Sequence, residues 1–158
     1  MSLFAIDAGH GGYDNGASYE GRLEKDDNLR LALAVRDELI RLGQDVVMTR
    51  DTDVFVPLDE RANIANNAGA DLFISLHRNS YPEQLPTANG LENYIYSYAT
   101  DENERMARLV LDKVVAVGVQ QDRGVNRANF AVLRYAEMPS MLLEMGFINN
   151  EEDNRLFD

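Results

Sequence analysis

Short apolar runs alternate with segments of helical periodicity from one end of the chain to the other. The runs have strand length and predict strands at Leu3 to Asp7, Val46 to Thr49, Leu72 to His77, Gly90 to Tyr98, Ala131 to Arg134 and Ser140 to Met145. Apolar residues three or four positions apart predict helices at Lys25 to Leu42, Pro57 to Gly69, Met106 to Val117 and Asn150 to Asp158. This alternation is typical of an α/β fold. We therefore expect a single domain with a mostly parallel central β-sheet of about six strands and helices on both faces.

Size, composition and charge narrow the functional classes. The chain has 158 residues, close to the roughly 150 of an ordinary domain, so we expect one domain over residues 1–158. No apolar run approaches the roughly 18 residues that cross a bilayer, and we expect no membrane insertion. The net charge of −12 would repel a phosphate backbone, so we also expect no nucleic-acid partner.

The absence of cysteine limits any metal site to histidine, aspartate and glutamate ligands. The only two histidines, His10 and His77, each fall at or just beyond the carboxyl end of a predicted strand. In a parallel sheet these ends share one edge, and ligands bind outside that edge. The two imidazoles can therefore meet, although a lone histidine more often completes a hydrogen bond in a core.

A third candidate, Glu144, lies inside the apolar run from Met141 to Phe147. A carboxylate in such surroundings is costly unless it has a partner. Two interpretations remain open from the residues alone, because buried carboxylates serve both as structural partners of arginine and as catalytic groups.

The glycine-rich loop from Gly9 to Gly12 does not predict a nucleotide site. The dinucleotide fingerprint requires a third glycine where Asp14 stands, and no Gly-Lys-Ser/Thr sequence follows. We interpret the loop as a tight turn that leaves His10 accessible to a ligand.

Four segments, in order along the chain, carry a family resemblance. They are Ile6 to Ala17 (IDAGHGGYDNGA), Leu23 to Leu29 (LEKDDNL), Ile74 to Ser80 (ISLHRNS) and Leu143 to Asn149 (LEMGFIN). Together they resemble the motifs of the zinc-dependent N-acetylmuramoyl-L-alanine amidase family, amidase-3, over nearly the whole chain. The resemblance implies a hydrolase of peptidoglycan that cleaves the amide between the lactyl group of N-acetylmuramic acid and L-alanine of the stem peptide.

The resemblance also implies one Zn²⁺ ion held by His10, Glu24 and His77, with the fourth position left for water. Only the motif identifies Glu24. An acidic residue beside Asp26 and Asp27 at a helix start is otherwise explained by the helix dipole.

Within the same motifs, Glu144 is expected to act as the general base for the attacking water. Asn79 is expected to help orient the substrate. Arg78 stands where the family more often has a small residue, which makes it a second candidate for substrate contact. Three further matching stretches are interpreted as structural: Thr49 to Asp53, Glu60 to Asn63 and Asp122 to Val125.

Two other functions remain as alternatives. A zinc peptidase or carboxypeptidase acting on the stem peptide would use a similar site, and a non-catalytic wall-binding module would retain the fold without turnover. By resemblance we expect a monomeric, secreted autolysin that is extracellular or associated with the bacterial cell wall. We expect any signal or wall-binding segment of the parent protein to lie outside these residues, and the final helix to be incomplete.

Overall fold

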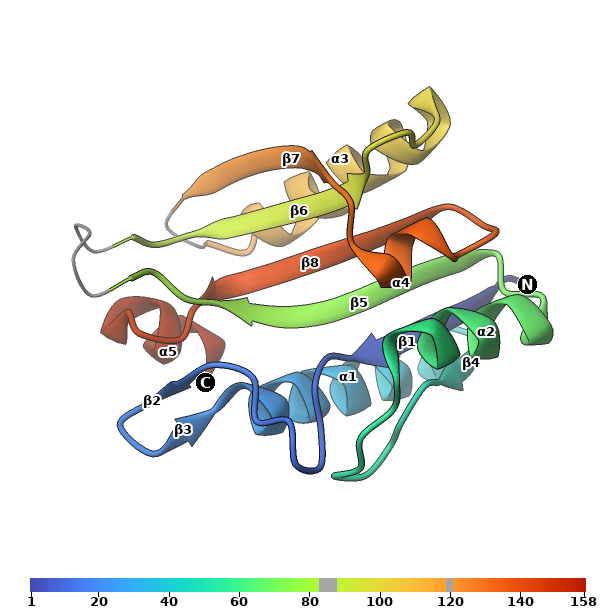
Figure 1. The fold of residues 1–158 in the computed structure, drawn as a ribbon. Helices are drawn as coiled ribbons and strands as arrows, with labels where there is room; N and C mark the ends of the chain where they lie inside the picture. Colours follow the sequence, from blue (N-terminus) through green and yellow to red (C-terminus); the bar gives the residue numbers. More distant parts are fainter. Residues whose placement is uncertain (83–87, 119–120) are drawn as a thin grey trace.

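Five of the six predicted strands lie side by side in one mixed sheet, shown in Figure 1. The computed structural model describes residues 1–82, 88–118 and 121–158. Within this part of the chain the sheet has six strands in the order β4-β1-β5-β8-β6-β7. Their bounds are β1 Leu3–Ala8, β4 Asp45–Met48, β5 Leu72–Asn79, β6 Leu91–Tyr96, β7 Asp122–Ala128 and β8 Ser140–Phe147, and a separate hairpin pairs β2 Ser18–Tyr19 with β3 Arg22–Leu23. The predicted α/β class with a mostly parallel sheet is confirmed.

The parallel part of the sheet determines where the site forms. Strands β4, β1, β5 and β8 all run in the same direction, whereas β6 pairs antiparallel with β8 and parallel with β7. The carboxyl ends of β1, β5 and β8 therefore share one edge, where Asp7 lies opposite Ser75 and His77 lies opposite Glu144. The predicted meeting of strand-end groups takes place at this edge.

Helices cover both faces of the sheet, as Figure 1 shows. The five helices of the described residues are α1 Glu24–Arg41, α2 Leu58–Ala68, α3 Asp101–Val115, α4 Ala131–Arg134 and α5 Glu151–Phe157. Helices α2 and α4 lie on one face, and α1 and α3 lie on the other. In the part of the chain that the structure describes, none of these helices is long and apolar enough to cross a membrane.

Each face buries its own apolar cluster. Under α2 and α4, Phe73 of β5 packs with Leu142 of β8, and both are almost fully buried. Under α1 and α3, Leu76 of β5 packs with Leu143 of β8. Alternating side chains along a strand point to opposite faces, so these positions place His77 on the α2 face and Arg78 on the α1 face.

One strand prediction is wrong: Ala131–Arg134 forms the short helix α4. Val132 and Leu133 are consecutive and are both buried against the same core cluster. A helical turn can bury two neighbours on one face, whereas a strand would turn one of them away. A four-residue apolar run does not distinguish the two structures by periodicity.

The sixth strand is instead β7, which includes the Asp122 to Val125 stretch that we interpreted as structural. Asp122–Ala128 is mostly polar and has no fully buried residue, and β7 lies at the edge of the sheet, where it pairs with β6. An edge strand buries little, so its sequence shows no apolar alternation that could have predicted it.

Candidate active site

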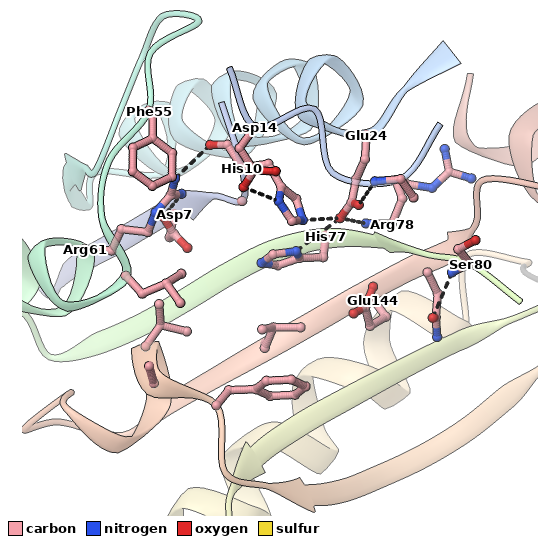
Figure 2. Close-up of a pocket in the computed structure, with 18 residues that line it drawn as sticks. Asp7, His10, Asp14, Glu24, Phe55, Arg61, His77, Arg78, Ser80 and Glu144 are labelled. Carbon is pink, nitrogen blue, oxygen red and sulfur yellow. Dashed lines mark hydrogen bonds and ion pairs between the residues drawn. The ribbon is translucent and has the colours of Figure 1, made fainter. Parts of the chain in front are cut away.

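Three of the predicted residues converge at the carboxyl edge of the sheet (Figure 2). His10 Nε2 lies 3.2 Å from Glu24 Oε1, and His77 Nδ1 lies 3.1 Å from the same oxygen. One potential ligand atom from each residue lies within 4.8 Å of the other two. The sequence separates these residues by up to 67 positions, and the fold brings them into one cluster.

Local backbone geometry presents the two imidazoles. His10 has a φ of 63°, a left-handed conformation that non-glycine residues rarely adopt, and its carbonyl oxygen accepts a 2.8 Å hydrogen bond from Arg61 Nη2. Gly9 lies directly against the other ring, because a Cβ atom there would come within 2.2 Å of His77 Cε1. The absence of a side chain at Gly9 thus makes room for His77.

Glu24 is the first residue of α1 and is almost fully buried. Its Oε2 accepts a 2.8 Å hydrogen bond from the backbone N–H of Ala17, while Oε1 faces both imidazoles. Burial alone would raise the pKa of Glu24, but its interactions with His10 and His77 outweigh burial and hold that pKa well below its usual range. The cluster therefore contains a permanent negative charge.

The electrostatics of His10 also favour a cation. Its Nδ1 lies 2.8 Å from Asp14 Oδ2, which leaves Nε2 directed at Glu24. Burial would lower the pKa of His10, yet contacts with Glu24 and Asp14 raise it to about 9. A site that holds a proton this firmly offers strong attraction to a metal cation in its place.

The donor set fits zinc. Two imidazole nitrogens and one carboxylate oxygen are borderline ligands that suit Zn²⁺, and three protein ligands leave a position open, as catalytic zinc requires. His10, Glu24 and His77 would hold the ion.

Glu144 lies beside this cluster, in register with His77 on the neighbouring strand. Its Oε2 is shielded from solvent and has no hydrogen-bond partner among the described residues. Burial, together with the nearby charges of Glu24 and Glu92, raises the pKa of Glu144 to about 7. This carboxyl group can therefore both accept and release a proton near neutral pH.

The raised pKa of Glu144 predicts a loss of stability with increasing pH in the metal-free protein. Between its usual pKa of 4.5 and about 7, the folded protein keeps this proton and the unfolded chain releases it. Unfolding is therefore increasingly favoured as the pH rises, and one pKa unit corresponds to about 1.4 kcal/mol. Denaturant titrations should show that the free energy of unfolding of Glu144→Gln increases relative to that of the wild type as the pH rises. The expected increase is on the order of 3 kcal/mol between pH 4.5 and 7.5. A difference that does not change with pH would contradict the prediction.

A cleft of about 580 Å³ opens over the cluster. One side of the cleft is lined by the three potential ligands and Glu144, and the opposite side is lined mainly by apolar side chains. The apolar side chains come from the loop before α2, from α2, from α4 with the residue before it, and from β8: Phe55, Leu58, Phe130, Val132 and Leu142. The site is thus polar where the potential ligands meet and apolar beside them.

The two residues predicted for substrate contact both line the cleft, but their side chains have different surroundings. Asn79 lines the cleft, and its Nδ2 lies 3.4 Å from Glu92 Oε1. The guanidinium of Arg78 instead points to the α1 face, where it is fully buried, donates to Asp27 at 2.7 Å and stacks on Phe157 at 4.2 Å. Arg78 therefore connects β5 to α1 and α5, and its side chain lies away from the cluster.

Sequence reasoning missed a set of buried polar groups behind the cluster. Asp7 has an exposed fraction of 1%, Ser75 is fully buried, and both lie on the cleft side of their strands. The sequence signal that could have identified Asp7 and Ser75 is the one that identified Glu144, namely a polar residue inside the apolar run of a strand. Ser75 also precedes His77 by two positions, which places both on one face.

A mixed α/β sheet that brings two imidazoles, a buried carboxylate and a separate glutamate into one cleft provides groups that could hold a metal ion and support hydrolysis. Comparison with known proteins gives the family. Residues 4–158 match the model of the Amidase_3 family, described as N-acetylmuramoyl-L-alanine amidase. The chain belongs to this family.

Individual relatives agree with the family match. The chain is 42% identical over 149 residues to the N-acetylmuramoyl-L-alanine amidase LytC of Bacillus subtilis, covering 94% of this chain and 30% of LytC. It is 39% identical over 155 residues to the N-acetylmuramoyl-L-alanine amidase CwlM of Bacillus licheniformis, covering 97% of this chain and 59% of CwlM. The chain thus spans less than two thirds of the length of either relative.

A solved structure is also closely similar. The N-acetylmuramoyl-L-alanine amidase of Clostridium difficile 630 superposes with a TM-score of 0.93 at 36% identity, covering 99% of this chain and 86% of that one.

Proposed function

We propose that this chain is a zinc-dependent N-acetylmuramoyl-L-alanine amidase that cleaves the amide between the lactyl group of N-acetylmuramic acid and L-alanine of the peptidoglycan stem peptide. The observation that carries the proposal is the pairing, in one cleft, of a His–Glu–His cluster with Glu144, whose buried Oε2 has no hydrogen-bond partner in the part of the chain that the structure describes. The family match and the relatives named as amidases support the choice of bond.

When bound, Zn²⁺ would supply a Lewis acid that polarises the amide carbonyl and lowers the pKa of a nearby water molecule to about 7. His10, Glu24 and His77 would hold the ion, and Glu144 stays outside the ligand set. Glu144 accepts the proton of the attacking water. It then returns that proton to the alanine nitrogen as the C–N bond breaks, a double role that its pKa of about 7 suits.

The remaining walls of the cleft would position the substrate. We assign Asn79 to the substrate amide groups, because its side chain lines the cleft and carries both a donor and an acceptor. We further propose that the enzyme acts as a monomer, since His10, Glu24, His77 and Glu144 meet within a single chain. Peptidoglycan lies outside the membrane, so the proposed substrate implies an extracellular or wall-associated enzyme that acts as an autolysin.

The test is digestion of purified peptidoglycan with and without a chelator, followed by zinc add-back and mass analysis of the soluble products. We expect chelator-sensitive release of intact stem peptides with free N-terminal alanine. Release of single amino acids would identify a zinc carboxypeptidase instead. Zinc binding without release of any product would indicate a wall-binding module. Release of the same amount of product with and without the chelator would refute zinc dependence.

A further inference from the structure

A chain of buried hydrogen bonds runs from His77 into the core on the side away from Glu24. Asp7 is its end point and accepts three hydrogen bonds: from Ser75 Oγ at 2.6 Å, from Thr49 Oγ1 at 2.6 Å and from Arg61 Nη1 at 2.9 Å. Burial alone would raise the pKa of Asp7, but the charge of Arg61 and the two hydroxyl groups hold that pKa below its usual range. Asp7 is therefore an ionised carboxylate that can only accept hydrogen bonds.

Because Asp7 can only accept hydrogen bonds, the Ser75 hydroxyl group must be the donor in the contact between them. A hydroxyl has one proton, and here it is directed to Asp7. The same Oγ lies 3.0 Å from His77 Nε2, so it must accept a hydrogen bond from that nitrogen. His77 thus carries a proton on Nε2. In the neutral ring the lone pair is then on Nδ1, the nitrogen that faces Glu24 at 3.1 Å.

We propose that Ser75 and Asp7 are positioning residues that hold His77 in the tautomer and orientation that present Nδ1 to the metal. The inference rests on the proposed metal site and is independent of which bond the enzyme cleaves. Groups that hold the second nitrogen of a ligand histidine orient the ring and tune its affinity for metal.

Arg61 extends this support to the second histidine. Its guanidinium pairs with Asp7 and also donates to the carbonyl oxygens of Ala8 and His10, at 2.7 and 2.8 Å. One buried side chain of α2 thereby holds the loop that carries His10 and the carboxylate that anchors Ser75. The Glu60 to Asn63 stretch, which we interpreted as structural, contains this contact.

The experiment compares Ser75→Ala with Thr49→Val. Each variant removes one hydroxyl hydrogen bond to Asp7, but only Ser75 contacts His77. We expect the zinc Kd, measured by competition with a chromogenic chelator, to rise about 10- to 100-fold in Ser75→Ala and to change less than about threefold in Thr49→Val. In the zinc-loaded wild type, ¹⁵N-edited NMR should show a slowly exchanging His77 Nε2–H proton that is lost in Ser75→Ala alone.

Equal zinc Kd values in the two variants, or a His77 proton on Nδ1 in the zinc-loaded wild type, would overturn the positioning role while leaving the proposed amidase intact. A wild-type chain that binds no zinc would overturn both. If Ser75→Ala does not fold, Ser75→Cys keeps the size of the side chain with a weaker acceptor, and its zinc Kd should rise in the same direction.

Discussion

Replacing Glu144 with glutamine should lower the rate of amide hydrolysis by about 10²- to 10⁴-fold, the usual contribution of a general acid–base group, and leave the zinc Kd within about threefold. Glutamine keeps nearly the shape of the side chain but cannot take up the proton of the attacking water. Glu144 also lies outside the potential ligand set, so metal affinity should not depend on its charge. Turnover on purified peptidoglycan and zinc competition titrations measure the two quantities separately.

The exposed Glu151→Gln provides the control for loss of a glutamate charge, and it should keep wild-type turnover. Full activity of Glu144→Gln would remove Glu144 from the mechanism. Loss of zinc in that variant would instead make Glu144 a ligand.

Replacing Glu24 with glutamine should weaken zinc binding by more than the roughly 10- to 100-fold that loss of a supporting group costs, and activity should fall with it. Glu24 is buried, and one oxygen faces both imidazoles, so the neutral amide removes the charge that the cation would neutralise. The zinc Kd and the zinc dependence of turnover measure the effect. Added zinc should restore part of the activity only at concentrations above the new Kd.

Asp26→Asn is the matched control, because Asp26 is an exposed acidic residue in the same first turn of α1. Both substitutions remove one negative charge from the helix N-terminus. If the helix dipole explained Glu24, the two variants would lose similar amounts of stability and neither would lose zinc. Equal zinc affinities in these two variants would therefore exclude Glu24 as a ligand.

The sequence predicted those site residues that carry a positional signal. His10 follows β1, His77 lies near the carboxyl end of β5, both strands end at one edge of the sheet, and Glu144 interrupts an apolar run. Glu24 carries no such signal, because acidic residues are common in a first helical turn, and only the family motif identified it. The fold of the sheet was predictable from the same apolar runs.

Three features of the structure could not be predicted from the local sequence pattern. The run Ala131–Arg134 is too short for its periodicity to separate a helix from a strand, and β7 buries too little to have an apolar pattern. The orientation of Arg78 depends on the register of β5, since one step along the strand exchanges the cleft for the opposite face.

The position of β8 in the sheet has a consequence for biosynthesis. Among the strands that the structure describes, β8 comes last in sequence but lies between β5 and β6, so it joins β4-β1-β5 to the β6-β7 pair. A nascent chain that lacks it has two sheet fragments with unpaired edges, and such edges favour aggregation or chaperone binding. Because β8 also carries Glu144, the proposed general base joins the candidate site only after this strand has inserted between β5 and β6.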